Sequence, residues 1–290
     1  MNDSRSTPPQ AARLPLLLYG TAWKEDATRA LTAMALRTGF RGIDTANQRR
    51  HYFEAAVGEA LQEAYDGAIV QRGELFLQTK FTHAAGQDHR LPYDPKAPLR
   101  RQVEQSLRSS LEHLRTDYLD SYVLHGPSSS RGLTDGDWEV WKAMEGFAGT
   151  GQVRSLGVSN VSLEQLDTLC ASATIQPSFV QNRCYARTGW DRRVREFCRA
   201  HRIVYQGFSL LTANGEIFRH PAMRAMIERT QRTAAQLVFG FARAVGMLPL
   251  TGTTQEAHMR EDLAIGGFDM GAEDVSAIEG IAGVVLTSPL

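Results

Sequence analysis

Residues 99–125 read LRRQVEQSLRSSLEHLRTDYLDSYVLH, and this stretch contains the unit from which the chain is built. Its first part has apolar residues three or four positions apart, the spacing of one helix face: Leu99, Val103, Leu107, Leu111 and Leu114. The short apolar run 118–124 follows and predicts a strand that ends at His125. A helix leading into a strand that ends in a polar residue indicates an α/β architecture.

The same alternation recurs along the whole chain. The expected strands are 16–20, 41–45, 75–81, 118–124, 153–158, 179–184, 204–208 and 247–250. The expected helices are 26–37, 53–65, 99–114, 137–147, 163–171, 192–201, 233–244, 255–263 and 272–281. Strands that alternate with helices are typical of parallel pairing, and eight such strands are the number that closes a (β/α)₈ TIM barrel.

A doubly wound open sheet is the competing architecture, and it requires a glycine-rich motif directly after an early strand. The nearest candidate is GTGQVR at 149–154, which lacks the third glycine and precedes a strand. No Gly/Ser linker or change in composition divides the chain. We therefore predict a flexible N-terminal segment, 1–13, followed by a single (β/α)₈ barrel domain, 14–290.

The composition argues against several classes of function. With 32 Lys+Arg against 32 Asp+Glu, the formal net charge is zero, so nothing favours a nucleic-acid or anionic-membrane partner. The start of the chain has no apolar signal core, which favours a cytoplasmic protein. The three cysteines form no CxxC pair, and no HxH or HExxH pair occurs, so we expect no metal site.

Three charged or titratable residues end consecutive predicted strands: Asp44, Lys80 and His125. Each has an ordinary alternative, because a lone Asp is often a turn former, a lone Lys a surface charge and a lone His a structural hydrogen-bonding group. Together they favour a catalytic site, because the carboxyl ends of barrel strands converge on one mouth. The lysine is informative because the chain has only four.

Several segments, in the right order, resemble the aldo-keto reductases: GTAW (20–23), GFRGIDTA (39–46), AAVGEAL (55–61), LFLQTK (75–80), LRTDYLDSYVLHGP (114–127), GQVRSLGVSN (151–160) and FVQN (179–182). The resemblance extends from residue 16 to about 283. It implies a (β/α)₈ barrel that reduces aldehydes and ketones with a nicotinamide cofactor, usually NADPH, and without a metal. It also implies a catalytic set of Asp, Tyr, Lys and His.

The resemblance places the catalytic Asp on Asp44, the Lys on Lys80 and the His on His125. The tyrosine is displaced, because the usual position, five residues after Asp44, is an arginine and the segment carries a two-residue insertion. We assign Tyr52 as the proton donor and keep His51 as its rival.

The chemistry favours a phenol as donor. Hydride transfer to a carbonyl carbon produces an alkoxide, which needs a proton. A phenol has a pKa of about 10, so we expect the Lys80 cation to lower the pKa of Tyr52 while Asp44 keeps Lys80 charged. His125, as a neutral ring, would orient the substrate oxygen.

The resemblance also implies cofactor contacts. Ser159, Asn160 and Gln181 match the residues that bind the nicotinamide carboxamide, and Phe208 matches the stacking aromatic residue. The other positions expected to contact cofactor are Thr21, Asp44, Ser209, Leu211, Thr251, Gly252, Thr253, His258 and Asp262. The residues expected around the substrate are Trp23, His51 and Trp190.

Cofactor choice rests on the family. Many NADPH-using members place a Lys and an Arg where this chain has Gly252 and His258, with Arg260 as a possible substitute. We expect NADPH, with NADH as the alternative. The expected partner is a small-molecule carbonyl substrate, and the chain would be a monomer or a homodimer. The rival hypothesis is a cofactor-bound regulatory or binding subunit with negligible turnover, which the displaced tyrosine favours.

Overall fold

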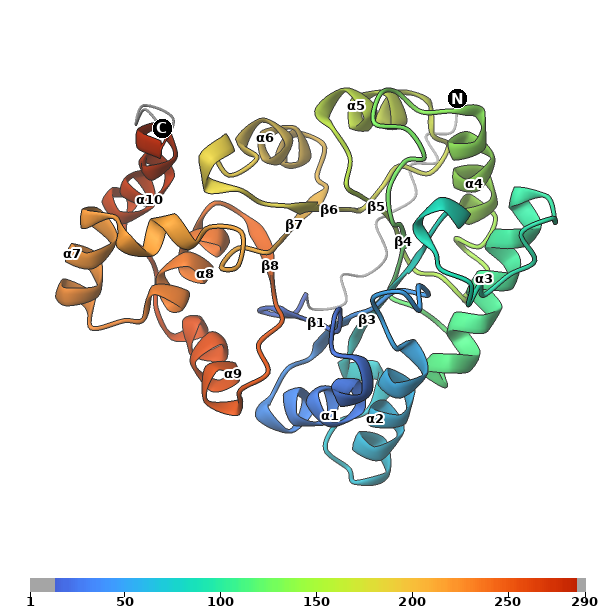
Figure 1. Ribbon diagram of the computed structural model, residues 1–290, viewed down its shortest axis with the longest axis horizontal. Helices are drawn as coiled ribbons and strands as arrows, with labels where there is room; N and C mark the ends of the chain where they lie inside the picture. Colours follow the sequence, from blue (N-terminus) through green and yellow to red (C-terminus); the bar gives the residue numbers. More distant parts are fainter. Residues whose placement is uncertain (1–13, 286–290) are drawn as a thin grey trace, which may run out of the picture.

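The structure is a computed structural model that describes residues 14–285. Within this range eight parallel strands close into a barrel in chain order, with helices around it (Figure 1). The strands are β1 (Leu18–Gly20), β2 (Gly42–Asp44), β3 (Phe76–Phe81), β4 (Ser121–Leu124), β5 (Leu156–Ser159), β6 (Phe179–Arg183), β7 (Val204–Phe208) and β8 (Met247–Thr251). The predicted TIM barrel is confirmed. The flexible segment expected at 1–13, and the end of the predicted domain at 286–290, lie outside the described residues.

The helices form the outer layer. They are α1 (Thr28–Thr38), α2 (Glu54–Asp66), α3 (Leu99–Leu114), α4 (Asp135–Glu145), α5 (Leu163–Ser172), α6 (Arg192–Ala200), α7 (Pro221–Thr230), α8 (Ala234–Ala244), α9 (Glu256–Leu263) and α10 (Ala272–Val285). Among residues 14–285 none of them is long and apolar enough to cross a membrane.

The sequence analysis missed helix α7. It lies between β7 and α8, in a stretch for which no helix was expected. Pro221 occupies its first turn, and the His220 ring accepts a hydrogen bond from the Ala222 amide at 3.2 Å. Only Met223 and Met226 of this helix are buried, so its apolar face is too narrow to give a clear helical period.

The interior of the barrel changes character along its axis. Below the mouth an apolar cluster fills it: Leu18, Phe76 and Phe179 are the first residues of their strands, and β8 adds Leu248 and Leu250. Packing there is tight, since a Cβ on Gly42 would lie 2.5 Å from a Pro15 side-chain carbon. Toward the carboxyl end the inward side chains are polar, and they include Gln78, Lys80 and Asp44. The apolar end thus supports a polar mouth.

Candidate active site

Lys80 and Asp44 form a buried ion pair at the mouth. Lys80 is the penultimate residue of β3 and Asp44 is the last residue of the adjacent β2, and both are almost inaccessible to solvent. The Lys80 Nζ atom donates to both Asp44 carboxylate oxygens at 2.8 Å and to the Thr45 carbonyl at 2.7 Å. Burial lowers the pKa of Lys80, and the Asp44 charge opposes that shift. The expected pairing of these two residues is therefore present.

Tyr52 lies beside this pair. Its ring centroid is 5.1 Å from the Lys80 Nζ atom and 5.9 Å from the His125 ring centroid, in an edge-on arrangement. The segment between β2 and α2 carries it, held by the Tyr52 amide, which donates to the Gln48 carbonyl at 3.0 Å. Despite the insertion, the phenol therefore lies next to both partners.

The expected acidification of Tyr52 needs correction. Burial raises the pKa of Tyr52, and the negative charge of Asp44 raises it further. The physical reason is that both carboxylate oxygens of Asp44 already engage Lys80, so the lysine charge does not reach the phenol unopposed. Tyr52 consequently keeps its proton throughout the physiological pH range, as a proton donor must.

His125 directly follows β4 and is neutral, as expected. Burial first, and then the charges of Lys80 and His51, lower its pKa to about 3. Its Nδ1 atom is 2.7 Å from the Thr82 hydroxyl oxygen, so Nε2 is the ring nitrogen left for other contacts. When the Thr82 hydroxyl donates to Nδ1, Nε2 carries the proton and can donate to an oxygen in the mouth.

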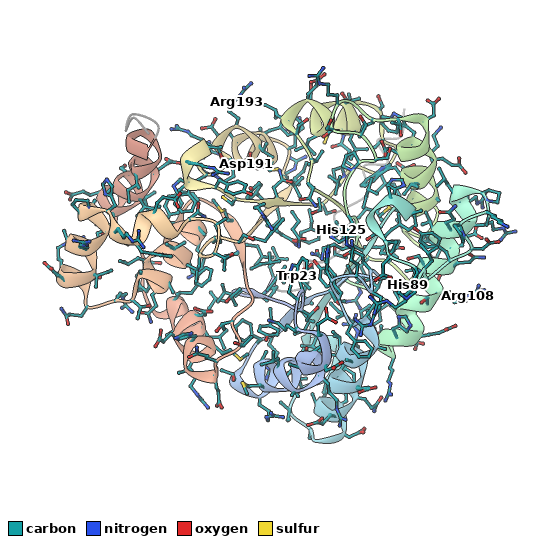
Figure 2. The ribbon with its side chains drawn as sticks, viewed as in Figure 1. Trp23, His89, Arg108, His125, Asp191 and Arg193 are labelled. Atoms are coloured by element: carbon teal, nitrogen blue, oxygen red, sulfur yellow. The ribbon has the colours of Figure 1, made fainter. Side chains whose placement is uncertain are left out.

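His51 and Trp23 form a stacked pair over the mouth. Their ring centroids are 3.9 Å apart, and the Trp23 amide donates to the His51 carbonyl at 2.7 Å. Figure 2 shows Trp23 and His125 near the centre of the ring of strands. Burial and then Arg50 lower the pKa of His51, so its ring is neutral. This disfavours His51 as a donor in its imidazolium form.

A cavity of about 1130 Å³ occupies the mouth. Most of the predicted site residues line it: Trp23, Asp44, His51, Tyr52, His125, Ser159, Asn160, Gln181, Phe208, Ser209, Leu211, Thr251, Gly252 and Thr253. Lys80 is not among the lining residues, because it lies fully buried and paired with Asp44.

Trp190 does not belong to this cavity, and its predicted role is corrected. The side chain is fully buried, its indole donates to the Ile278 carbonyl at 3.2 Å, and its ring centroid lies 4.9 Å from that of Phe241. The chain after β6 turns through left-handed conformations at Gly189, Trp190 and Asp191. This turn directs the indole into the core between α8 and α10.

Three of the predicted cofactor residues also lie outside the cavity lining. Thr21 is buried, and its hydroxyl donates to the Asp44 carbonyl at 3.0 Å. Asp262 is buried on α9, where it accepts from the Thr251 hydroxyl at 2.7 Å and burial raises its pKa to about 6. His258 is exposed on the same helix. Thr21 can therefore act only through Asp44, and Asp262 only through Thr251. Arg260, the expected substitute for the missing basic pair, forms an ion pair with Glu256.

Lys24 is a site residue that the sequence analysis missed. It is only 7% exposed, lines the cavity and donates from Nζ to the Gly252 carbonyl at 2.7 Å. A Cβ on Gly252 would lie 3.9 Å from that ammonium group. Lys24 therefore supplies a cation beside the position where the expected lysine is missing. Its scarcity, as one of four lysines, was the available signal.

The residues fit a nicotinamide carboxamide, which needs hydrogen-bond donors and acceptors. Asn160 uses Nδ2 to donate to the His125 carbonyl at 2.8 Å, which leaves its Oδ1 atom available as an acceptor. Gln181 donates from Nε2 to Asp44 at 2.9 Å, which likewise leaves Oε1 available. Phe208 provides a half-buried aromatic ring in the cavity wall. Among the described residues, no group of three or more His, Cys, Asp or Glu side chains is arranged to hold a metal ion.

Sequence comparisons identify relatives over most of the chain. A family model described as "Aldo/keto reductase family" matches residues 18–282. Deoxymugineic acid synthase 1-D from Triticum aestivum is 31% identical over 289 residues, which cover 91% of this chain and 86% of that protein. The uncharacterized oxidoreductase YtbE from Bacillus subtilis is 25% identical over 281 residues, which cover 96% and 93% of the two chains.

Solved structures agree in fold. The aldo-keto reductase AKR2E5 of the silkworm, Bombyx mori, complexed with NADPH, superposes with a TM-score of 0.78 at 24% identity and covers 92% of this chain and 84% of that chain. An aldo/keto reductase from Brucella melitensis superposes with a TM-score of 0.77 at 26% identity, covering 92% and 95%. Because the family model matches nearly the whole chain, this protein belongs to the aldo/keto reductase family of oxidoreductases.

Proposed function

We propose that this protein reduces aldehydes or ketones to alcohols with NADPH, and that Tyr52 donates the proton. The observation that carries the proposal is the cluster of Tyr52, His125 and the Lys80–Asp44 pair at one mouth. The same mouth offers amide acceptors at Asn160 and Gln181, which suit the cofactor's carboxamide.

A nicotinamide held by Asn160 and Gln181 would supply the hydride for the carbonyl carbon, and the carbonyl oxygen, which takes up the electron pair of the C=O π bond, would then need a proton. Tyr52 and His125 hold that oxygen between the phenol hydroxyl and the imidazole Nε2–H. The Tyr52 proton then moves to the oxygen and completes the alcohol. An alkoxide is a stronger base than a phenolate, so this transfer is favourable although the pKa of Tyr52 is raised.

Lys80 and Asp44 act on the tyrosine and not on the substrate. As the phenol gives up its proton, negative charge develops next to the Lys80 ammonium, about 5 Å from the ring. Asp44 keeps the ammonium in place by its two 2.8 Å contacts. Solvent reprotonates the tyrosine after the alcohol leaves.

NADPH is the proposed cofactor in preference to NADH, because Lys24 offers a positive charge at the end of β8. Its ammonium group lies in the cavity wall and bonds to Gly252. The 2′-phosphate, which NADPH carries and NADH lacks, would gain from that charge. The small-molecule carbonyl substrate would enter beside Trp23 and His51, which line the open side of the same cavity.

The test is a cofactor-oxidation assay on a panel of aromatic and aliphatic aldehydes. Tyr52→Phe is expected to lower kcat by about a hundredfold to ten-thousandfold, the usual contribution of a general acid. The matched control is Tyr185→Phe, since Tyr185 lines the same cavity away from Lys80, and it is expected to keep kcat within about threefold.

His51→Gln tests the rival donor. Full activity in Tyr52→Phe together with its loss in His51→Gln would reverse the assignment. Tight NADPH binding by the wild-type protein without turnover of any aldehyde would instead support the regulatory or binding subunit.

A further inference from the structure

A second cavity, of about 780 Å³, lies at the opposite end of the barrel from the mouth. Its wall includes Val204 and Met247, the first residues of β7 and β8, so it lies at the amino ends of these strands. Helix α6 packs on β7 and helix α8 packs on β8 (Figure 1). Among residues 14–285 the two cavities have no lining residue in common.

Four arginines line this second cavity. Arg195 and Arg199 are four positions apart and therefore share one face of α6. Arg202 lies in the turn between α6 and β7, and Arg243 lies in the last turn of α8. No acidic residue of the described chain belongs to the lining. The wall of the cavity is therefore positively charged.

Two of the four guanidinium groups already have partners within the protein. The buried Arg195 donates to the Trp190 carbonyl at 2.7 Å and to the Glu279 carboxylate at 2.6 Å. Arg243 donates to the Ile265 carbonyl at 3.1 Å. These contacts hold both side chains against the fold, so the capacity to bind a ligand rests mainly on the other two arginines.

Arg199 and Arg202 are exposed, and no acidic side chain in the part of the chain that the structure describes forms an ion pair with either. Glu196, the acidic residue on α6 closest in sequence to Arg199, is paired with Arg192 at 2.8 Å. A guanidinium group has a planar fork of donors that matches the oxygens of a carboxylate or a phosphate. Two such groups in one cavity wall therefore favour an oxyanion as ligand.

The rest of the wall is largely apolar. Leu16, Val204, Met247 and Leu248 line the cavity, and Leu14 at its edge is 44% exposed. A small hydrated ion would leave this surface in contact with water, whereas an apolar group would cover it. The cavity thus combines a surface for charge with a surface for hydrocarbon.

We propose that this cavity binds an amphipathic oxyanion, a carboxylate or phosphate head group attached to an apolar body. The head group binds Arg199 and Arg202, and the apolar body packs on the amino ends of β7 and β8. The chain has zero formal net charge, yet residues 183–202 contain seven arginines and only two acidic residues. Positive charge is therefore concentrated in the segment that supplies this wall.

The first experiment compares four probes by isothermal titration calorimetry with the full chain. Decanoate and decyl phosphate combine a charge with a hydrocarbon tail, whereas decanol lacks the charge and inorganic phosphate lacks the tail. At least one amphipathic probe is expected to bind about tenfold or more tightly than decanol and inorganic phosphate, the equivalent of one charge-assisted hydrogen bond. The tighter of the two amphipathic probes identifies the head group.

The second experiment removes the guanidinium groups one at a time. Arg199→Met and Arg202→Gly are each expected to weaken binding of the amphipathic probe by about tenfold. Arg202 has a φ of 58°, which glycine adopts more readily than arginine, so Arg202→Gly should fold at least as stably as the wild-type protein. Circular dichroism melting checks the folding of each variant, and the comparison of probes needs no variant.

Two control variants keep the arginines of the cavity. Arg193 is exposed on α6 at the outer edge of the molecule and is not part of the cavity lining (Figure 2). Lys24→Met removes a cation from the mouth cavity instead. Arg193→Met and Lys24→Met are both expected to bind the amphipathic probe with wild-type affinity.

The inference is wrong if neither amphipathic probe binds the wild-type protein, or if decanol or inorganic phosphate binds as tightly. It is also wrong if Arg199→Met and Arg202→Gly both keep wild-type affinity. Loss of binding in Lys24→Met, with full binding in both arginine variants, would assign the probe to the mouth and would overturn the inference as well. None of these measurements uses NADPH or an aldehyde, so their outcome is independent of the proposed function.

Discussion

The two ends of the barrel interior are filled by side chains of opposite polarity, although the same strands supply them. At the amino end, Phe76 and its apolar neighbours fill the space with no polar group to satisfy. At the carboxyl end, only two and four residues further along β3, Gln78 and Lys80 are equally buried but polar. Burying a charge or an amide costs free energy unless it is paired. The apolar end therefore contributes stability that the mouth does not.

The largest effect is expected at the mouth. Lys80→Met removes the cation beside Tyr52 and leaves the Asp44 charge next to the phenol, so kcat/KM should fall by about 10³- to 10⁴-fold in the aldehyde assay. Lys142→Met, at an exposed lysine on α4, is the matched control and should keep wild-type activity. If Lys80→Met keeps most of the activity, the idea that the polar mouth serves catalysis and the apolar end serves stability is wrong.

The next effect is expected at the apolar end. Phe76→Ala removes a ring that packs 5.3 Å from Phe179, centroid to centroid, and should lower the free energy of unfolding by about 3 to 5 kcal/mol in urea denaturation. The kcat of the folded variant should stay within about threefold of wild type. Trp23→Ala, at the 70% exposed ring of the mouth, should change the unfolding free energy by no more than about 0.5 kcal/mol.

The smallest effect concerns Lys24 and pH. Burial lowers the pKa of Lys24 to about 8, so its ammonium is charged below that pH and loses its charge as pH rises through it. NADPH affinity at constant ionic strength should therefore weaken by about fivefold to tenfold between pH 7 and pH 9. At pH 7 the Lys24→Met variant should bind NADPH with the affinity that the wild-type protein has at pH 9, and its NADPH affinity should not change with pH over this range.

The exposed Lys96 provides the control, because Lys96→Met removes a lysine of ordinary surroundings. It should leave the pH dependence unchanged. Equal NADPH affinity for wild type and Lys24→Met across the pH range would show that the cation at Gly252 plays no part in cofactor choice.

The polar residues at the mouth could be predicted because each stands at a recognisable place in the local sequence, the end of an apolar run. Asp44 and Lys80 each end an apolar run, and parallel strands bring such ends together without any knowledge of distant contacts. The pairing register that sets them 2.8 Å apart follows from the same topology. This is why the barrel and the ion pair could be expected from the order of residues alone.

The errors have nonlocal causes. Trp190 was placed wrongly because three successive residues with left-handed backbone conformation turn its segment into the core. Of these three, only Gly189 is a residue type that indicates such a conformation in the sequence. The pKa of Tyr52 is raised first by burial and then by the Asp44 charge, and neither the burial nor the position of that charge can be read from the order of residues. The hydrogen bond from Gln78 on β3 to Gln206 on β7 was not predicted, because each residue looks like an ordinary strand residue in the sequence and the two are 128 positions apart.

The stacking of Trp23 on His51 has a practical consequence. Trp23 is 70% exposed, whereas Trp138 is half-buried and Trp141 and Trp190 are buried in the hydrophobic core. Water-soluble collisional quenchers such as iodide should reach this indole before the other three, and a Trp138→Phe variant leaves only the two buried indoles beside it. The molecule thus carries its own optical reporter in the cavity wall, in contact with His51.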